Sequence, residues 1–366
     1  MTESSIVQKF YQAHLDRVSR SFAFCIARLD SPMRERVGLG YLICRIVDTI
    51  EDAGWKNFAA QEKSFREFDE FLVHKPSRES VLAWRERFPK ADVSEGETLL
   101  LNDAHQIFTD FHSLPNDARE ILAAPILSMS AGMLHFMKRR SVEGELRLRN
   151  VSDVNRYCFF VAGVVGEMLS GFVGSSVGSS GGSLNEAAKE KTKTSIQDAF
   201  RFGLFLQKIN LLKDQAGDEK QGRFLVPSRE ILRRSLAQDA EIAFRYLRGL
   251  PDRALGFRLF CAWSLFLGLA SLPWIEQSQG AVDKAKIPRD EAALLLTAIE
   301  DNISNHAVLD ELYRGLNPPL KPASMASEVL STSLFGESDQ NEEKELLALY
   351  SGRLSDREIL DLFHGA

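Results

Sequence analysis

Two stretches of this sequence place charged side chains along one stripe of an otherwise apolar helix. In YLICRIVDTIED (41–52), four polar positions recur at i, i+4, i+7 and i+11, on a single helical face: Tyr41, Arg45, Asp48 and Asp52. Apolar residues cover both flanks of that face: Leu42, Ile43, Ile46, Val47 and Ile50. A charged stripe between apolar flanks predicts a helix that turns its polar side toward an internal space.

A second segment repeats this pattern. In FLQKINLLKDQAGDEK (205–220), polar positions fall at i, i+3, i+7 and i+11: Gln207, Asn210, Asp214 and Asp218. Each stripe therefore holds two aspartates one helical turn apart, where like charges repel each other. If the two pairs face one cavity of low dielectric, the repulsion is severe unless a cation neutralises it.

A divalent cation with oxygen ligands fits this arrangement. Magnesium bound by few carboxylates keeps coordination positions open for the phosphate of a substrate. The alternative is a solvated acidic face, or acids paired with Arg45 and Lys213. One stripe alone would favour that alternative, whereas two matched stripes with a basic residue near each favour the metal site.

Length and composition are those of a globular protein. The 366 residues, 44% of them hydrophobic, suffice for one large core or two smaller ones. The net charge of −6, from 45 basic and 51 acidic residues, argues against a nucleic-acid partner. The start, MTESSIVQKF, lacks the pattern of a signal peptide. The cysteines form no CxxC pair, which indicates reduced core thiols in a cytoplasmic protein: Cys25, Cys44, Cys158 and Cys261.

Helical periodicity predicts an all-α protein. Residues 117–140 and 151–172 carry apolar side chains at helical spacing, and Ser152 or Asp153 is a suitable N-cap for the second helix. The strict alternation typical of β-hairpins is missing. The apolar segment 259–275 is short for a membrane span and contains two serines and a proline, so we expect a buried core helix.

Two breaks suggest the domain organisation. GFVGSSVGSSGGS (171–183) resembles a phosphate-binding loop only in composition, because no strand precedes it, and we expect a linker. GLNPPLKPAS (315–324) ends the main body. We therefore expect a catalytic domain at 1–314 and a linker with a helical tail at 315–366, in which SDRE forms a capping box that begins the last helix.

Four patches resemble the squalene and phytoene synthase family: SRSFAF (19–24), YLICRIVDTIED (41–52), YCFFVAGVVGEMLSG (157–171) and FLQKINLLKDQAGDEKQGR (205–223). The similarity extends from about Ser19 to about Ile287, and the paired aspartate motifs match in order and spacing. The resemblance implies the isoprenoid synthase fold, a single helical domain around a central apolar cavity. It also implies magnesium, and farnesyl diphosphate as the substrate.

The resemblance also implies roles for individual residues. The family's metal-binding positions are occupied by four aspartates, which Glu51 and Asn210 could assist: Asp48, Asp52, Asp214 and Asp218. Its diphosphate-binding positions are occupied by four basic residues: Arg20, Arg45, Lys213 and Arg223. Further substrate contacts are expected from Ser21, Phe22, Tyr41 and Gln207. Tyr41 and Tyr157 match tyrosines near the reacting carbons. The plain alternatives are solvated surface for the cations and core packing for the tyrosines.

Two further features have two interpretations each. Phe22 and Phe24 either pack in the core or line the cavity, since aromatic faces stabilise carbocations. A strip of small residues either allows close helix packing or leaves room for a prenyl chain: Ala162, Gly163, Gly166 and Ser170.

The reaction that the resemblance implies couples two farnesyl diphosphates to presqualene diphosphate, which is then ionised, rearranged and reduced with NADPH to squalene. Reducing members of the family share a basic Lys-Ile-Arg-Lys segment that helps hold NADPH. DKAKIPRDE (283–291) matches it in part, with Lys286 and Arg289 as cofactor-binding residues and Pro288 in place of the first arginine. The string FLQKIN favours the reducing enzymes.

Two other functions stay open. One is a non-reducing head-to-head synthase whose product is phytoene, dehydrosqualene or presqualene diphosphate. The other is a non-catalytic helical binding protein derived from a synthase, although intact aspartate pairs argue against it. The end of the chain, LLALYSGRLSDREILDLFHGA, is too charged for a membrane anchor, so we expect a cytoplasmic protein with at most peripheral membrane contact. The sequence leaves prenyl chain length, oligomeric state and the role of the tail open.

Overall fold

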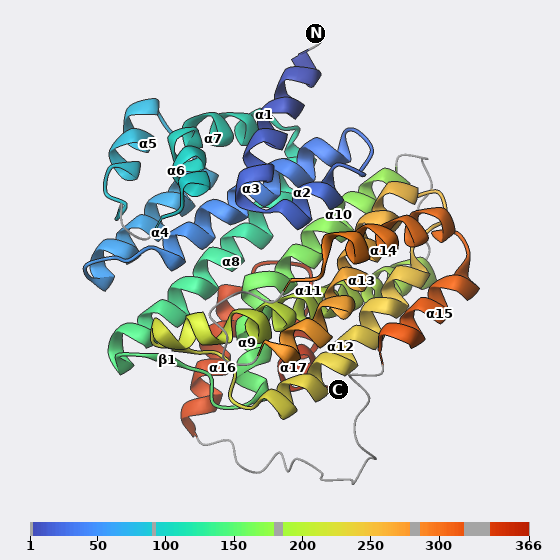
Figure 1. Cartoon of the computed structure of the whole chain (residues 1–366). Coiled ribbons are helices and arrows are strands. Elements are labelled where there is room, and N and C mark those ends of the chain that lie inside the picture. The colour runs from blue at the N-terminus through green and yellow to red at the C-terminus, as the bar shows by residue number, and fades with distance from the viewer. Residues whose placement is uncertain (1–2, 90–92, 179–185, 279–285, 318–336, 366) are drawn as a thin grey trace.

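The computed structural model describes residues 3–89, 93–178, 186–278, 286–317 and 337–365, apart from the side chains of 3–6, 20–21, 174–178, 186–195 and 337–339 (Figure 1). Helices make up nearly all regular structure in these ranges, so the all-α prediction is confirmed. The described strands are two residues each, β1 (Leu146–Arg147) and β2 (Arg223–Phe224), and they pair in parallel.

The helices, in chain order, are α1 (Glu3–Val18), α2 (Arg20–Ile26), α3 (Met33–Asp52), α4 (Phe58–Val73), α5 (Arg78–Arg85), α6 (Glu95–Asn102), α7 (Ala104–Ser113), α8 (Asn116–Glu143), α9 (Val151–Cys158), α10 (Val164–Gly178), α11 (Glu186–Lys220), α12 (Arg229–Gly249), α13 (Leu255–Gln277), α14 (Arg289–Asn302), α15 (His306–Leu316), α16 (Glu337–Leu349) and α17 (Asp356–His364). A π-helical turn, Phe159–Gly163, joins α9 to α10.

Helix α11 crosses α10 and the π-helical turn before it at very short range. A Cβ atom on Gly166 would lie 2.1 Å from the carbonyl oxygen of Ala199, and one on Gly203 would lie 2.4 Å from the carbonyl oxygen of Ala162. A larger residue at either glycine would therefore push the two backbones apart. Of the two interpretations of the small-residue strip, close helix packing holds for Gly166.

Helix α13 is a core helix, as its composition predicts. Trp263, Leu265 and Phe266 on this helix are fully buried. Within the part of the chain that the structure describes, three helical stretches could cross a membrane by length and composition alone: 116–143, 151–173 and 255–277. In the last of them 78% of the most apolar window is buried inside the protein. The four cysteines are buried and free, as expected for core thiols.

Two local predictions from sequence were wrong. Residues 171–178 continue α10 instead of beginning a linker, because packing against α8 and α11 outweighs the low helix propensity of glycine; residues 179–183 lie outside the described part. The N-cap of α9 is Asn150, whose side chain accepts a hydrogen bond from the backbone of Asp153. The capping box at Ser355 and Glu358 is confirmed.

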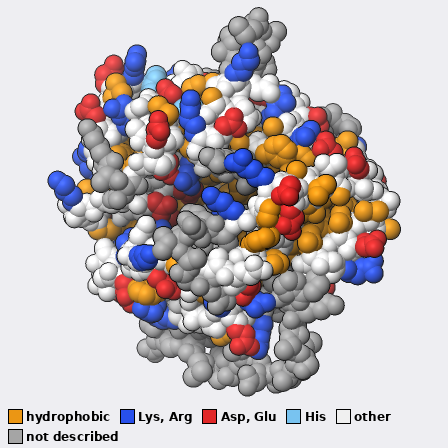
Figure 2. Space-filling model, viewed as in Figure 1, with side chains coloured by type: hydrophobic (Ala, Val, Ile, Leu, Met, Phe, Trp, Pro, Cys, Tyr) orange, Lys and Arg blue, Asp and Glu red, His pale blue; other side chains and the backbone are white. Residues whose placement is uncertain are grey.

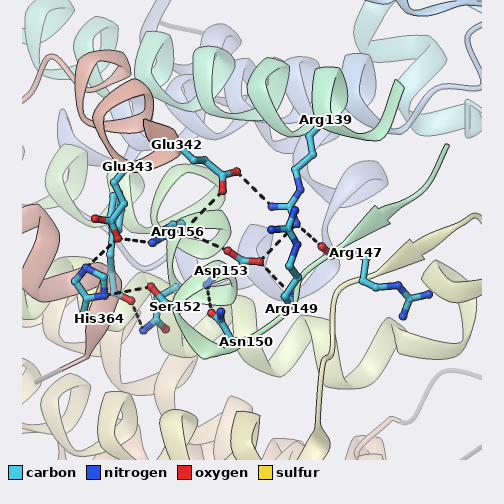
Figure 3. Close-up of polar contacts among 12 residues, drawn as sticks. Arg139, Arg147, Arg149, Asn150, Ser152, Asp153, Arg156, Glu342, Glu343 and His364 are labelled. Carbon is cyan, nitrogen blue, oxygen red and sulfur yellow. Dashed lines mark hydrogen bonds and ion pairs between the residues drawn. The ribbon is translucent and has the colours of Figure 1, made fainter. Parts of the chain in front are cut away.

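The C-terminal helices fold back onto the body of the protein. Helix α16 packs on α8 and α17 packs on α9 and α11, which buries Leu346, Ile359 and Phe363. The ring of Phe363 lies 5.3 Å from that of Phe159 in the π-helical turn. Figure 3 shows the polar side of this contact, where the buried guanidinium of Arg156 reaches the carboxylates of Asp153, Glu342 and Glu343.

Glu167 on α10 is a second anchor for the tail. Its carboxylate accepts hydrogen bonds from the Tyr350 hydroxyl at 2.6 Å and from the Arg353 backbone and Nε at 2.9 and 3.0 Å. We expect Glu167→Ala to lower the free energy of unfolding by about 2 kcal/mol, because three donors lose their buried acceptor. Urea unfolding measures this. The exposed pair Arg66–Glu62 supplies the control, since Arg66→Ala should change stability by less than about 0.5 kcal/mol. Equal stability of both variants would contradict an anchoring role.

Candidate active site

A cavity of about 530 Å³ lies between α2, α3, the α9–α10 segment, α11, α12 and α13. Both polar stripes border it with all of their members: Tyr41, Arg45, Asp48, Asp52, Gln207, Asn210, Asp214 and Asp218. Glu51, Lys213 and Arg223 add further charge. The rest of the wall is largely apolar and includes Phe22, Ile26, Val37, Leu169, Phe202, Phe257 and Phe260. The cavity thus combines a highly charged region with an apolar interior.

Arg223 bridges the two aspartate motifs. Its Nη1 donates to Asp52 of the first motif and its Nη2 to Asp218 of the second, the latter at 2.7 Å. Local structure places the guanidinium there, because Gly222 turns the chain after α11 with a φ of 74° that favours glycine. The strand β2 then pairs with β1 and holds the backbone of Arg223 in place. One cation therefore neutralises one acid from each motif.

Arg45 has a partner that the sequence did not reveal. Its Nη2 donates to Glu97 at 2.5 Å, while its Nη1 lies 3.8 Å from Asp48. Glu97 belongs to α6, where it closes a capping box with Ser94. The sequence contains the capping pattern S-x-x-E at Ser94 and Glu97, but no local pattern links Glu97 to Arg45. Glu97 thus orients a cation of the site from outside the cavity.

Burial dominates the electrostatics of the acids. It raises the pKa of Asp48 to about 7 against the opposing charge of Arg45, with Asp52 adding repulsion. Burial, followed by the negative charge of Asp52, raises the pKa of Glu51 to about 8. The pKa of Asp218 is also raised, again mainly by burial. Near neutral pH, Asp48 and Glu51 therefore hold protons for part or most of the time, and a metal cation would displace them.

The donor set fits magnesium. Five acids border the cavity against three basic side chains, so negative charge is in excess once the protons on the acids are displaced: Asp48, Glu51, Asp52, Asp214 and Asp218 against Arg45, Lys213 and Arg223. Within the described residues, no three His, Cys, Asp or Glu side chains gather at metal-binding spacing. The carboxylates are instead divided between two helices. Such a division suits magnesium, which binds through one or two carboxylates and keeps several waters.

Cation affinity should rise with pH. A protonated carboxyl cannot bind a metal, so a cation must displace the protons held at Asp48 and Glu51, whose pKa values are about 7 and 8. We expect Mg²⁺ to bind at least about tenfold more tightly at pH 8.5 than at pH 6.5. Calorimetric titration in two buffers of different ionisation enthalpy would also detect the released protons. A pH-independent affinity without proton release would contradict these assignments.

Tyr157 joins the charged region to the apolar interior. Its hydroxyl donates to Glu51 Oε1 at 3.3 Å, and its ring packs edge-on to Phe136 at 5.2 Å. Burial raises the pKa of Tyr157 well above its ordinary value, so the hydroxyl stays protonated and can donate. The helix leaves α-geometry at the π-helical turn just beyond it, a feature frequent at functional sites.

Of the two phenylalanines in α2, the structure places one at the cavity. Phe22 borders it, with its ring 5.6 Å from that of Tyr41, whose pKa burial raises to about 12. Phe24 does not line the cavity. It is 45% exposed and stacks on Trp263 at 4.8 Å, because residues two apart lie on nearly opposite faces of a helix.

Four of the residues expected at the site are not found at the cavity in the part of the chain that the structure describes. The side chains of Arg20 and Ser21 lie outside the described part. Arg289 is the first residue of α14 and Lys286 lies just before it. Both are exposed, and neither borders the cavity.

Comparison with known proteins decides the family. Residues 15–254 match the model described as squalene/phytoene synthase, and this range contains both aspartate motifs, Tyr41 and Tyr157. The chain belongs to the squalene/phytoene synthase family. It is 30% identical over 227 residues to the squalene synthase of Eremothecium gossypii, which is 61% of this chain and 46% of the relative. It is 30% identical over 214 residues to that of Rattus norvegicus, 58% of this chain and 45% of the relative.

The chain spans about half the length of these curated relatives. Among solved structures, the complex of TcSQS with the ligand BPH1237 is similar with a TM-score of 0.68 and 19% identity, over 98% of this chain and 96% of that one. A dehydrosqualene synthase in complex with ligand gives a TM-score of 0.55 and 16% identity, over 83% and 99%. The fold is the isoprenoid synthase fold that the squalene/phytoene synthase family implies.

Proposed function

We propose that the protein is a prenyltransferase that couples two farnesyl diphosphates head to head. The observation that carries the proposal is one cavity in which two facing Asp-x-x-x-Asp motifs and three basic side chains meet an apolar interior. Diphosphate and prenyl chain need these two environments side by side. The relatives named squalene synthase support the same class of reaction.

Each group at the charged end has a part in the reaction. Ionisation of an allylic diphosphate leaves negative charge on the leaving group. Arg45, Lys213 and Arg223, which border the cavity, would neutralise this charge. The aspartate motifs would hold magnesium: Asp48 and Asp52 on α3, Asp214 and Asp218 on α11. Magnesium, when bound, supplies further positive charge for the departing diphosphate. Asp52 and Asp218 would then no longer need Arg223, whose guanidinium becomes available to the diphosphate.

The apolar part protects the cation that remains on the prenyl chain. The rings of Phe22, Tyr41 and Phe260 border the cavity and can face this positive charge. The surrounding aliphatic and aromatic walls exclude water, which would otherwise capture the cation as an alcohol. The Tyr157 hydroxyl, held by Glu51, lies where the charged and apolar parts meet.

We further propose that the product is squalene, formed through presqualene diphosphate with NADPH as reductant. Lys286 and Arg289 are the candidate cations for the phosphates of NADPH. A Lys286→Ala/Arg289→Ala double variant should raise the KM for NADPH several-fold while presqualene diphosphate forms at the wild-type rate. An unchanged KM would exclude this cofactor site.

Release of an apolar product suggests where the protein works. We propose a cytoplasmic protein with peripheral membrane contact. Figure 2 shows hydrophobic side chains gathered over α14, where Leu294 is 74% exposed. Such a patch can rest on the lipid interface while the body stays in water.

Product analysis tests the function. Purified protein is incubated with farnesyl diphosphate and Mg²⁺, first without and then with NADPH, and the lipids are identified by mass spectrometry. We expect presqualene diphosphate without NADPH and its conversion to squalene on addition. A product unchanged at saturating NADPH would place the protein among the non-reducing synthases. No product at all would favour the non-catalytic binding protein and contradict the proposal.

A further inference from the structure

Arg45 has two acidic neighbours, and it bonds the one that lies outside the cavity. Its Nη2 donates to Glu97 Oε1 at 2.5 Å, whereas its Nη1 lies 3.8 Å from Asp48 Oδ2, which is too far for a hydrogen bond. Arg45 and Asp48 border the cavity, and Glu97 does not. A residue away from the cavity therefore decides where the guanidinium of Arg45 points.

The start of α6 holds the Glu97 carboxylate in one position. Its Oε2 accepts a hydrogen bond from the Ser94 backbone at 2.9 Å, and the Glu97 backbone donates to the Ser94 hydroxyl at 3.3 Å. This turn also lies directly against the end of α1, because a Cβ atom on Gly96 would be 2.9 Å from the carbonyl oxygen of Arg17. Glu97, which is 8% exposed, thus offers Arg45 a fixed carboxylate.

Asp48 is the other acid within reach of this guanidinium. Arg45 and Asp48 lie three residues apart on α3, a spacing at which opposite charges can pair on a helix. A closed pair would occupy both the carboxylate that magnesium needs and the cation that the diphosphate needs. The two side chains are 29% and 31% exposed, so the pair would be of moderate strength. Binding of either ligand would then have to break it.

Resting on the proposed prenyl transfer, we propose that Glu97 is a positioning residue that keeps Arg45 and Asp48 apart. With the guanidinium drawn toward α6, Asp48 stays available to a divalent cation. The Nη1 group of Arg45 stays available to the departing diphosphate, to which a charged donor bonds strongly. Glu97 acts through Arg45 and contacts neither the metal nor the substrate.

Calorimetric titration with Mg²⁺ alone, at a fixed pH and without substrate, tests this role. Glu97→Gln removes the charge that holds the guanidinium and nearly preserves the shape of the side chain. We expect the Kd for Mg²⁺ to rise at least about fivefold, the scale of one partly exposed ion pair that must be broken. Glu97→Asp withdraws the carboxylate by one methylene and should act in the same direction, so it replaces Glu97→Gln if circular dichroism shows that variant unfolded.

Glu95→Gln is the matched control. Glu95 is exposed two residues away on the same helix, so this variant loses the same charge without releasing Arg45 and should keep the wild-type Kd. A double-variant cycle separates positioning from other effects. In an Arg45→Gln background there is no guanidinium to release, and Glu97→Gln should change the Kd by less than about twofold.

Two results would overturn the positioning role: an unchanged Kd in the folded Glu97 variant, or an equal rise in the Arg45→Gln background, which would show a direct charge effect or a general loss of packing. If the wild type still couples farnesyl diphosphate, either result leaves the proposed function standing. If Mg²⁺ binding follows the expected cycle but the wild type forms no product, the proposed function fails and the positioning role stands. A wild type that binds no Mg²⁺ would overturn both.

Discussion

Asp48→Asn and Asp214→Asn should each lower turnover of farnesyl diphosphate by at least about a hundredfold, the effect of removing one strong electrostatic stabiliser from an active site. Each substitution removes a negative charge from one of the two motifs that border the cavity and nearly preserves the shape of the side chain. Initial rates at saturating Mg²⁺ and substrate measure the effect. Neither variant should unfold, because a neutral amide at either position cannot repel the neighbouring acids of the cavity.

An acid beside the second motif provides the control. Glu219 is exposed on the same helix as Asp214, accepts a hydrogen bond from Gln215 at 2.8 Å and does not border the cavity. Glu219→Gln should therefore keep wild-type turnover. Chelation with EDTA should abolish activity, and added Mg²⁺ should restore it. Near-wild-type activity in EDTA, or in both aspartate variants, would overturn the metal assignment.

Tyr157→Phe should lower turnover by about a hundredfold while the protein stays folded, the usual scale for a positioned hydroxyl that assists proton movement or charge development. The hydroxyl is held 3.3 Å from Glu51 at the boundary between the charged and apolar parts of the cavity. Because it stays protonated, it can donate a hydrogen bond to a leaving or rearranging group. Single-turnover rates for formation and consumption of presqualene diphosphate would show which step depends on it.

Another buried tyrosine separates this effect from simple destabilisation. The Tyr11 hydroxyl donates to Asp110 at 2.9 Å, and Tyr11 is 5% exposed but lies away from the cavity. Tyr11→Phe also removes one tyrosine–carboxylate hydrogen bond and should cost about 1 kcal/mol of stability with no change in kcat. If Tyr157→Phe resembled Tyr11→Phe in both respects, Tyr157 would be a packing residue only.

The charged end of the cavity suggests how the protein tolerates its own acids when no metal cation is bound. Arg223 joins Asp52 to Asp218, and burial raises the pKa values of Asp48, Glu51 and Asp218. Shared counter-ion and bound protons thus reduce the repulsion that the sequence pattern predicts. A divalent cation can displace both Arg223 and the bound protons. Asp48→Asn and Asp214→Asn should therefore change the cation affinity, its pH dependence and the turnover rate together.

Local patterns in the sequence determined the polar stripes of the site and several of the helices. The positions of the two stripes follow from helix geometry, which depends only on residue spacing, and all their members border one cavity. The buried helix at 259–275 follows from its largely apolar composition, and the final helix begins at the capping box of Ser355 and Glu358. These features are encoded within one or a few helical turns.

Other features were decided only by the tertiary structure. Glu97 reaches Arg45 across 52 residues, Ser170 meets Tyr246 across 76, and Glu167 meets Arg353 across 186. The helix through residues 171–178 persists because α8 and α11 pack against it, although its glycines alone predict a loop. Hydrogen-bond partners and close helix contacts depend on which surfaces the folded chain brings together. Residue spacing specifies the face of a helix, whereas only packing of the whole chain specifies what that face meets.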